Sequence, residues 1–275
     1  MDVNKVLKEG QDILKKSNID IREVRLLLAL AMNLDLSNLI SKKECNIEEY
    51  KKFIEYVSKR ANHTPFAYLS GKKEFMKLSF NVTPAVLIPR EETEILVEKV
   101  IELSKSLNKD KIKILDICTG SGIIAISLAK YIKKSKVVAV DISMDALKVA
   151  IENAKLNNVN VEFIQSDLFT NINYHDFDII VSNPPYISKS EILNLQEEVK
   201  KEPIIALDGG EDGLNFYKNI SFFAKDYLLE KGFLFFEIGY NQGDLVKEIL
   251  LKNEFKNIMI LKDLSNNNRV VIGEK

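Results

Sequence analysis

The stretch Ile112–Tyr131 reads IKILDICTGSGIIAISLAKY, and this stretch decides the fold. Four of its first six residues are apolar, and a short run of this kind is typical of a parallel strand buried on both faces. A turn with two glycines, Thr119–Gly122, follows directly, and a helical pattern begins at Ile123. This order of strand, glycine turn and helix is the opening unit of a doubly wound α/β sheet, in which ligands bind at the carboxyl ends of the strands.

The same alternation of short apolar runs and helical patterns continues toward the C-terminus. Because parallel strands need crossover connections, this alternation predicts an α/β fold with helices on both faces of the sheet. The predicted strands are Ile112–Ile117, Val137–Val140, Val161–Ile164, Phe177–Val181, Gly232–Ile238, Asn257–Leu261 and Val270–Ile272. The predicted helices are Glu91–Leu107, Ile123–Tyr131, Asp145–Leu156, Leu214–Leu229 and Leu245–Leu251. Seven strands in this order fit an open, Rossmann-like doubly wound sheet.

The part of the chain before this sheet has a different pattern. Residues 2–60 carry apolar side chains at helical spacing, and Asn46 followed by Glu49 is typical of a capping box at a helix start. The stretch Glu74–Val82 alternates between apolar and polar residues, which predicts a hairpin, and prolines interrupt residues 84–89. We therefore expect a small helical domain at residues 1–72, a hairpin linker at 73–90 and the sheet domain at 91–275.

The composition excludes several classes of protein. The chain has 275 residues, with 39 Lys+Arg, 40 Asp+Glu, two Cys and two His. Cys45 and Cys118 are too far apart for a disulfide framework, and two histidines are too few for a multi-histidine metal site, so we expect no metal. A net charge of −1 gives no general attraction to nucleic acid or to a membrane surface. No apolar run approaches about 20 residues and the N-terminus does not resemble a secretory signal, so we expect a reducing cytoplasm.

The glycine turn after the first strand is the candidate cofactor site. Glycine permits positive φ and lets a ligand approach the backbone, and a helix N-terminus offers free N–H groups. The pattern of Gly120–Ala125 also fits G-x-G-x-x-A, so the turn alone does not distinguish a nicotinamide cofactor from S-adenosylmethionine. Asp116 favours S-adenosylmethionine, because a carboxylate attracts an ammonium and a sulfonium rather than a pyrophosphate. The candidate cofactor-binding residues here are Asp116, Cys118, Thr119, Gly120, Ser121 and Gly122.

Acidic residues also follow the next two predicted strands. Asp141 ends the second strand, where an acidic residue accepts hydrogen bonds from ribose hydroxyls, a function that suits either cofactor. Asp167 and Leu168 follow the third strand, where the carboxylate would meet an adenine amino group and the leucine would pack on the ring. Asp167 is interpreted equally well as a helix N-cap.

The segment Asn183-Pro184-Pro185-Tyr186 follows the fourth predicted strand and is therefore expected at the same edge of the sheet. Two consecutive prolines fix φ and remove two backbone donors. The rim that remains has only acceptors, namely the Asn183 side-chain oxygen and the Pro184 carbonyl, and such a rim suits a planar NH2 group. Tyr186 would lie flat against that group. We predict that all four residues bind the substrate and that Asn183 also borders the cofactor.

These two motifs together resemble those of the S-adenosylmethionine-dependent methyltransferases that modify planar amino groups in adenine, cytosine or glutamine. Further segments resemble, more narrowly, the protein-glutamine methyltransferases that act on peptide chain release factors, the PrmC/HemK family. Those segments are Pro65–Gly71, Glu74–Phe75, Leu87–Glu94, Glu202–Pro203, Ala206–Leu207, Gly209–Leu214 and Glu237–Gly239 with Gln242. The family has Gly where this chain has Cys118, which we expect to be accommodated with a negative φ, and Pro where it has Glu91.

The resemblance implies a methyltransferase sheet, S-adenosylmethionine as the cofactor, a class I release factor as the partner, and a monomer. The methyl group would pass to the side-chain amide nitrogen of the glutamine in the release factor's Gly-Gly-Gln motif. That nitrogen is a poor nucleophile, and no residue in the sequence suggests a strong base. Asn183 and Pro184 would instead accept both N–H bonds and aim the nitrogen at the methyl group, while Tyr186 holds the amide plane. The slightly basic helical domain would recognise the body of the release factor.

Several alternative functions share part of these motifs. A glutamine methyltransferase that acts on a large-subunit ribosomal protein would have the same core. A DNA amino-methyltransferase would need a target-recognition domain and a basic groove, which the sequence does not indicate. A nicotinamide-dependent dehydrogenase would not explain the two prolines. A binding module without catalytic activity would require that the glycine turn bind no cofactor.

Two further residues have alternative interpretations. Arg90 would either bind the cofactor carboxylate or pair with Glu94. A nucleophilic function of Cys118 is less well supported, because no histidine lies near it in the sequence.

Overall fold

The computed structural model describes residues 1–275, and these form two compact units. The helical unit consists of Met1–Gly71 together with Gln196–Lys201, and the sheet unit consists of Lys72–Leu195 together with Glu202–Lys275. The hairpin that follows Gly71 therefore belongs to the sheet unit. No feature of the sequence predicted that residues 196–201 would join the helical unit, because the residues that hold them there are distant along the chain.

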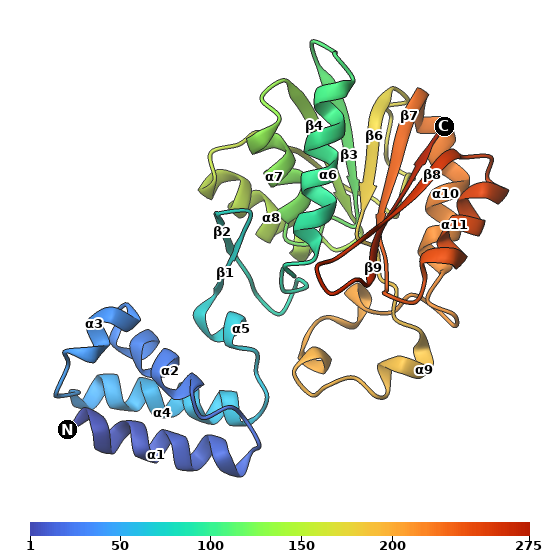
Figure 1. The fold of residues 1–275 in the computed structure, drawn as a ribbon. Helices are drawn as coiled ribbons and strands as arrows, with labels where there is room; N and C mark the ends of the chain where they lie inside the picture. Colours follow the sequence, from blue (N-terminus) through green and yellow to red (C-terminus); the bar gives the residue numbers. More distant parts are fainter. The chain divides into compact units, whose positions relative to one another are not determined.

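The helical unit is made of helices around an apolar core (Figure 1). The helices are α1 (Val3–Lys16), α2 (Glu23–Met32), α3 (Leu36–Ile40), α4 (Ile47–Ala61), α5 (Phe66–Ser70) and the 3-10 helix η1 (Val199–Lys201). The start of α4 confirms the predicted capping box. Asn46 Oδ1 accepts hydrogen bonds from the backbone N–H groups of Glu48 and Glu49, each at 2.9 Å, and the Glu49 carboxylate accepts from the Asn46 N–H at 2.8 Å. These bonds satisfy donors that have no partner within the helix.

Arg60 in α4 holds the segment 196–201 in the helical unit. Its side chain is buried, its Nε donates to the Glu23 carboxylate of α2 at 2.5 Å, and its Nη2 donates to Glu198. Breaking a buried ion pair is costly, because the charge left behind has neither water nor a partner. This ion pair therefore explains why a segment so distant in sequence packs with the helices.

The sheet unit is built on seven strands in the order β5-β4-β3-β6-β7-β9-β8 (Figure 1). The strands are β3 (Ile112–Ile117), β4 (Ser135–Asp141), β5 (Glu162–Gln165), β6 (Phe177–Ser182), β7 (Leu228–Glu237), β8 (Lys256–Lys262) and β9 (Asn268–Glu274). β3 to β7 pair in parallel, whereas β9 is antiparallel to both β7 and β8. A separate antiparallel hairpin, β1 (Lys72–Phe75) with β2 (Leu78–Asn81), forms where it was predicted. The predicted seven-stranded α/β sheet is confirmed.

Helices cover both faces of this sheet. They are α6 (Thr93–Ser106), α7 (Ile123–Tyr131), α8 (Met144–Leu156), α10 (Asn215–Tyr227) and α11 (Gly243–Lys252). Two short helices, α9 (Lys189–Ile192) and the 3-10 helix η2 (Ile204–Ala206), lie in the connection between β6 and α10 and bury no residue. α6 and α7 pack with Phe75 and Phe80 of the hairpin in one apolar core, and α10 and α11 form a second core with the opposite face. No helix of the chain has both the length and the apolar character needed to cross a membrane.

Most predicted boundaries differ from the structure by one or two residues, and the largest error lies at the start of β7. We expected a helix as far as Leu229 and a strand from Gly232, but α10 ends at Tyr227 and β7 begins at Leu228. Leu228 is buried and pairs with Phe177 of β6, ahead of an irregularity in the register of the two strands. A buried, paired leucine therefore starts the strand before the glycine that suggested its beginning.

The order in which the chain adds strands to the sheet reverses between β3 and β6, and the site lies at this topological switch point. From β3 the chain continues to β4 and β5 on one side, and then returns to β6 and β7 on the other. The last residues of β3 and β6, Ile117 and Ser182, pair with each other. The glycine turn and Asn183 thus leave neighbouring parallel strands at the same level, and open α/β sheets bind ligands in the crevice outside such a point.

Candidate functional site

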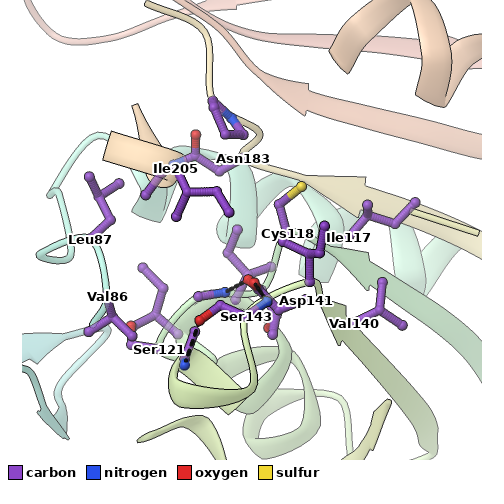
Figure 2. A pocket seen from close by; sticks show the side chains of 18 of the residues that line it. Val86, Leu87, Ile117, Cys118, Ser121, Val140, Asp141, Ser143, Asn183 and Ile205 are labelled. Atoms are coloured by element: carbon purple, nitrogen blue, oxygen red, sulfur yellow. Dashed lines mark hydrogen bonds between the residues drawn. The ribbon is translucent and has the colours of Figure 1, made fainter. Parts of the chain in front are cut away.

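A pocket opens at the carboxyl ends of β3, β4 and β6 (Figure 2). Its cavity has a volume of about 170 Å³ and is open to solvent on one side. Figure 2 shows Asn183 and Ile205 on one side of it and Ser121, Asp141 and Ser143 on the other. The predicted site residues that line the pocket are Cys118, Thr119, Gly120, Ser121, Asp141, Asp167, Leu168, Asn183 and Pro185, whereas Asp116, Gly122, Pro184 and Tyr186 do not line it.

Asp116 lies beneath the glycine turn instead of in the pocket. Its Oδ2 accepts hydrogen bonds from Thr119 Oγ1 at 2.6 Å and from the Ala125 N–H at 3.2 Å, and its buried Oδ1 has no hydrogen-bond partner. Burial raises the pKa of this carboxyl to about 7, although the two hydrogen bonds oppose the rise. Gly122 also supports the turn from behind, with φ of +82° and Ala150 only 3.1 Å from where a Cβ would lie. Both residues shape the turn that lines the pocket.

Asp141 joins the end of β4 to the glycine turn and faces the pocket. Its Oδ2 accepts a hydrogen bond from the Gly120 N–H at 2.8 Å, and its Oδ1 accepts from the Ser143 N–H at 2.9 Å. Burial raises the pKa of this carboxyl, whereas the backbone N–H groups lower it. A carboxylate has lone pairs beyond these two bonds. Asp141 can therefore accept a hydrogen bond from a ligand hydroxyl while it holds the turn.

Cys118 has a left-handed backbone conformation, and our expectation of a negative φ is wrong. Its φ is +61°, and φ of Leu168, which also lines the pocket, is +48°. This region is unfavourable for residues with a Cβ and costs about 1–3 kcal/mol. The next residue, Thr119, donates its N–H to the Val140 carbonyl at 3.0 Å, so pairing with β4 holds the turn in this conformation. Burial raises the pKa of the Cys118 thiol well above its ordinary value, which argues against a nucleophilic thiolate.

Substitutions at Cys118 test this backbone strain. The free energy of unfolding of Cys118→Gly is expected to lie within about 1 kcal/mol of the wild-type value, because relief of the backbone strain offsets the larger entropy of glycine in the unfolded chain. Cys118→Val is expected to be about 1–3 kcal/mol less stable than Cys118→Gly, because a β-branched residue tolerates positive φ poorly. Chemical denaturation measures both variants. Equal stabilities would show that the left-handed conformation carries no such cost.

The loop after β5 places Asp167 and Leu168 at the pocket. Asp167 is exposed and begins a turn, not a helix, so the N-cap alternative does not describe it. Ser166 is buried below them, where its Oγ donates to the Leu168 carbonyl at 2.8 Å and accepts from the Asn171 N–H at 3.0 Å. These bonds hold Leu168 in its left-handed conformation with its side chain at the pocket.

The loop after β6 brings Asn183 to the pocket, while Tyr186 packs behind it. Asn183 Nδ2 donates to Thr93 Oγ1 at 3.5 Å, at the long limit of a hydrogen bond. Tyr186 packs against the core that α10 and α11 form with the sheet, and burial raises the pKa of its phenol to about 12. Its ring therefore does not line the pocket in this conformation, and its expected position against the substrate amide stays a prediction.

Gln242 fixes the backbone of this loop. Its Nε2 donates to the carbonyls of Tyr186 and Gly213, at 3.0 and 3.3 Å. Its Oε1 accepts from the Gly239 N–H at 2.9 Å and from the Tyr217 hydroxyl at 3.3 Å. All hydrogen-bonding positions of this amide are used, so one buried side chain holds three separate segments together.

Arg90 lines the pocket and pairs with Glu202. The second oxygen of Glu202 accepts from the Ile88 N–H at 2.9 Å. The alternative pair of Arg90 with Glu94 is not formed, and Glu94 instead accepts from the Met76 N–H at 2.5 Å. The chain before α6 is thus held at the pocket by a carboxylate from a segment that follows the Asn183 loop.

Several lining residues were missed by sequence reasoning. They are Val86, Thr93, Ile205 and Phe216, among others from the linker before α6 and from the segments after Asn183. Thr93 lies in the charged segment Leu87–Glu94, which was noted only for its resemblance to the family, and the other three are apolar or aromatic residues that give no local signal of ligand contact. The only available signal was the order of the strands, which indicates where distant loops meet.

Comparisons with known proteins agree with this architecture. Residues 5–71 match the family described as PrmC N-terminal domain, and residues 92–211 match the family described as Methyltransferase small domain. The chain is 38% identical to a release factor glutamine methyltransferase of Thermodesulfovibrio yellowstonii, over 98% of both chains. It is 40% identical to a release factor glutamine methyltransferase of Clostridium acetobutylicum, over 99% of this chain and 98% of the relative.

A comparison of structures supports the fold. A methyltransferase from Pyrococcus furiosus superposes with a TM-score of 0.54, at 20% identity, over 74% of this chain and 91% of that one. At this identity the similarity concerns the architecture alone.

Proposed function

This chain belongs to the release factor glutamine methyltransferase family, and we propose on that premise that it methylates the glutamine side-chain amide in the Gly-Gly-Gln motif of class I peptide chain release factors. S-adenosylmethionine, when bound, supplies an electrophilic methyl group on its sulfonium. One observation carries the proposal, namely that the glycine turn and Asn183 line the same pocket. The residues expected to hold the cofactor and the residue expected to hold the amide are therefore in one cavity.

The residues of the pocket fit S-adenosylmethionine. Asp141 has acceptor capacity for ribose hydroxyls, and the exposed Asp167 carboxylate can accept from an amino group. Leu168 and Phe216 supply apolar surface for a flat ring. Asp116 lies under the turn with an unpartnered oxygen and a raised pKa, and a nearby positive sulfonium and ammonium would favour its ionised form.

The amide-binding rim would act by positioning. An amide nitrogen has a delocalised lone pair, and the residues that line the pocket include neither a histidine nor a lysine that could serve as a base. Asn183 Oδ1, which lines the pocket, would accept one N–H bond of the substrate amide, and the Pro184 carbonyl, which does not line the pocket in this conformation, would accept the other. These bonds would aim the nitrogen and stabilise positive charge that develops on it. The proton can then leave to water through the open mouth of the pocket. Tyr186 would support the plane of the bound amide.

We assign recognition of the body of the release factor to the helical unit. Its surface exposes Leu36, Ile40 and Ile47, and exposed apolar side chains of this kind suit contact with a protein. We propose the cytoplasm as the place of action, because a chain with only two cysteines, Cys45 and Cys118, offers no disulfide framework that an oxidising compartment would have to form.

Transfer of label from S-adenosylmethionine tests the function. The chain is incubated with labelled S-adenosylmethionine and either a class I release factor or a copy in which the Gly-Gly-Gln glutamine is alanine. We expect label on the first protein and none on the second. A large-subunit ribosomal protein and DNA serve as alternative acceptors. Equal label on both release factors, or label on an alternative acceptor only, would contradict the proposed substrate.

A further inference from the structure

A buried carboxylate, that of Glu237, lies beside Asn183 at the end of β7. β6 and β7 are parallel and Ser182 pairs with Phe236, so Asn183 and Glu237 are the next residues on neighbouring strands. Glu237 is 3% exposed, and its buried Oε2 has no hydrogen-bond partner. Buried polar atoms are nearly always paired in native proteins, so an unpaired carboxylate oxygen at the ligand-binding edge of a sheet calls for a functional explanation.

Thr93 at the start of α6 completes this group. It is fully buried within its helix, borders the pocket, and lies 3.5 Å from Asn183 Nδ2. Burial raises the pKa of Glu237 to about 7, and hydrogen bonding from Thr93, the charge of Arg269 and hydrogen bonding from Asn183 oppose this rise, whereas Glu92 adds to it. Thr93 and Asn183 are therefore both close enough to influence the carboxylate, although its Oε2 has no hydrogen-bond partner.

The hydrogen-bond donors and acceptors of Glu237 and Thr93 determine which of its two orientations the Asn183 amide adopts. The pKa of about 7 means that Glu237 is mostly ionised above about pH 7, and in that form it only accepts, so the Thr93 hydroxyl would direct its single proton to Glu237. The Thr93 oxygen then offers only lone pairs to Asn183, which must present its NH2 side to it. The Asn183 oxygen is left for the pocket, where an incoming amide N–H needs an acceptor.

We propose that Glu237 and Thr93 are positioning residues that select one of the two orientations of the Asn183 amide, with Nδ2 inward and Oδ1 toward the substrate. This inference rests on the proposed methylation of a substrate amide. In the opposite orientation, Nδ2 would face the NH2 group of the substrate, and two donors would oppose each other. The long contact between Asn183 and Thr93 is of the kind that shortens when a substrate completes a site.

Two substitutions combined in one cycle test this function. Glu237→Gln keeps the size of the side chain but allows it to donate as well as accept, so the selection is lost. Asn183→Asp replaces the amide with two acceptor oxygens, for which the orientation no longer matters, but places two carboxylates side by side. For the wild type, both single variants and the double variant, the measurements are kcat and KM with a release factor, Kd for S-adenosylmethionine and Tm.

The two backgrounds are expected to respond in opposite directions. In the wild-type background, Glu237→Gln should lower kcat by about 10-fold, an effect typical of residues that orient a reacting group. In the Asn183→Asp background, the same substitution should raise kcat by about 10-fold, because it removes the second carboxylate. KM and the cofactor Kd should stay within about threefold of the parent in each comparison. Loss of activity in both backgrounds, or no loss in the wild-type background, would overturn the proposal.

Thr93→Val gives an independent check, because it keeps the shape of the side chain and removes the hydroxyl. It should lower kcat about as much as Glu237→Gln, and combining the two should be no slower than the slower single variant, since both act through one chain of hydrogen bonds. Losses that multiply would overturn the proposed chain. If the wild-type protein methylated no release factor, that result would contradict both this inference and the proposed function. If the wild-type protein were active but the Glu237 variants failed these tests, only this inference would be contradicted.

Discussion

Asn183→Ala is expected to lower kcat for glutamine methylation by at least about 100-fold while the Kd for S-adenosylmethionine changes by less than about threefold. The Asn183 side chain lines the pocket at the end of β6, opposite the residues that are assigned to the cofactor. Its oxygen is the acceptor that would aim the substrate nitrogen and stabilise charge that appears only during transfer. Removing such an interaction affects turnover more than binding of the ground state.

Steady-state kinetics with a release factor and calorimetry with S-adenosylmethionine separate the two effects. Asn194→Ala is the matched control, because Asn194 is an exposed asparagine of the same long connection, and its Nδ2 bonds only the Ser190 carbonyl at 3.3 Å. That variant should retain wild-type turnover. If Asn183→Ala turned over at nearly the wild-type rate, the acceptor rim would not be the catalytic device. If turnover and affinity fell equally, Asn183 would be part of the scaffold of the cofactor site.

Asp141→Asn is expected to weaken binding of S-adenosylmethionine by about 10- to 100-fold. The two oxygens of Asp141 accept hydrogen bonds from the N–H groups of Gly120 and Ser143. An asparagine has one acceptor oxygen, so one of these N–H groups would lose its partner and face an NH2 group. An unsatisfied buried donor costs about 1–3 kcal/mol, and the turn that carries the cofactor would shift to avoid it.

Calorimetry measures this affinity, and denaturation of the unliganded protein shows whether the fold is retained. Asp145→Asn is the matched control, because Asp145 lies on the first turn of α8, is exposed and pairs only with Lys148 at 2.8 Å. Its affinity should not change. An unchanged affinity in Asp141→Asn would mean that Asp141 neither holds the turn nor meets the cofactor.

Much of the fold could be predicted, because the signals are local. The apolar run Ile112–Ile117 and the turn that follows it fix the first strand and helix, and later runs repeat the pattern. The start of β7 was misplaced because Gly232 resembles a boundary, whereas pairing with β6 decides where the strand begins. The antiparallel direction of β9 was also not predicted, since an apolar run does not reveal which neighbour it pairs with.

The motifs predicted several residues that line the pocket, but they did not predict the contacts that hold those residues in place. Cys118, Asp141 and Asn183 were predicted from motifs, and the structure brings them to one pocket. The positive φ of Cys118 could not be read from its type, because the pairing of the turn with β4 imposes it. The contact of Asn183 with Thr93 joins residues 90 positions apart, so no pattern within either segment indicates it.

The sequence by itself determined the alternation of strands and helices, the glycine turn and the pair of donor-free prolines after Asn183, because periodicity and backbone chemistry are properties of neighbouring residues. Only the tertiary structure decided that Asp116 lies under the turn, that Arg90 pairs with Glu202, and that Thr93 and Glu237 surround the Asn183 amide. These arrangements depend on strand order and register. Those in turn follow from burial of apolar faces over the whole sheet and not from any one segment.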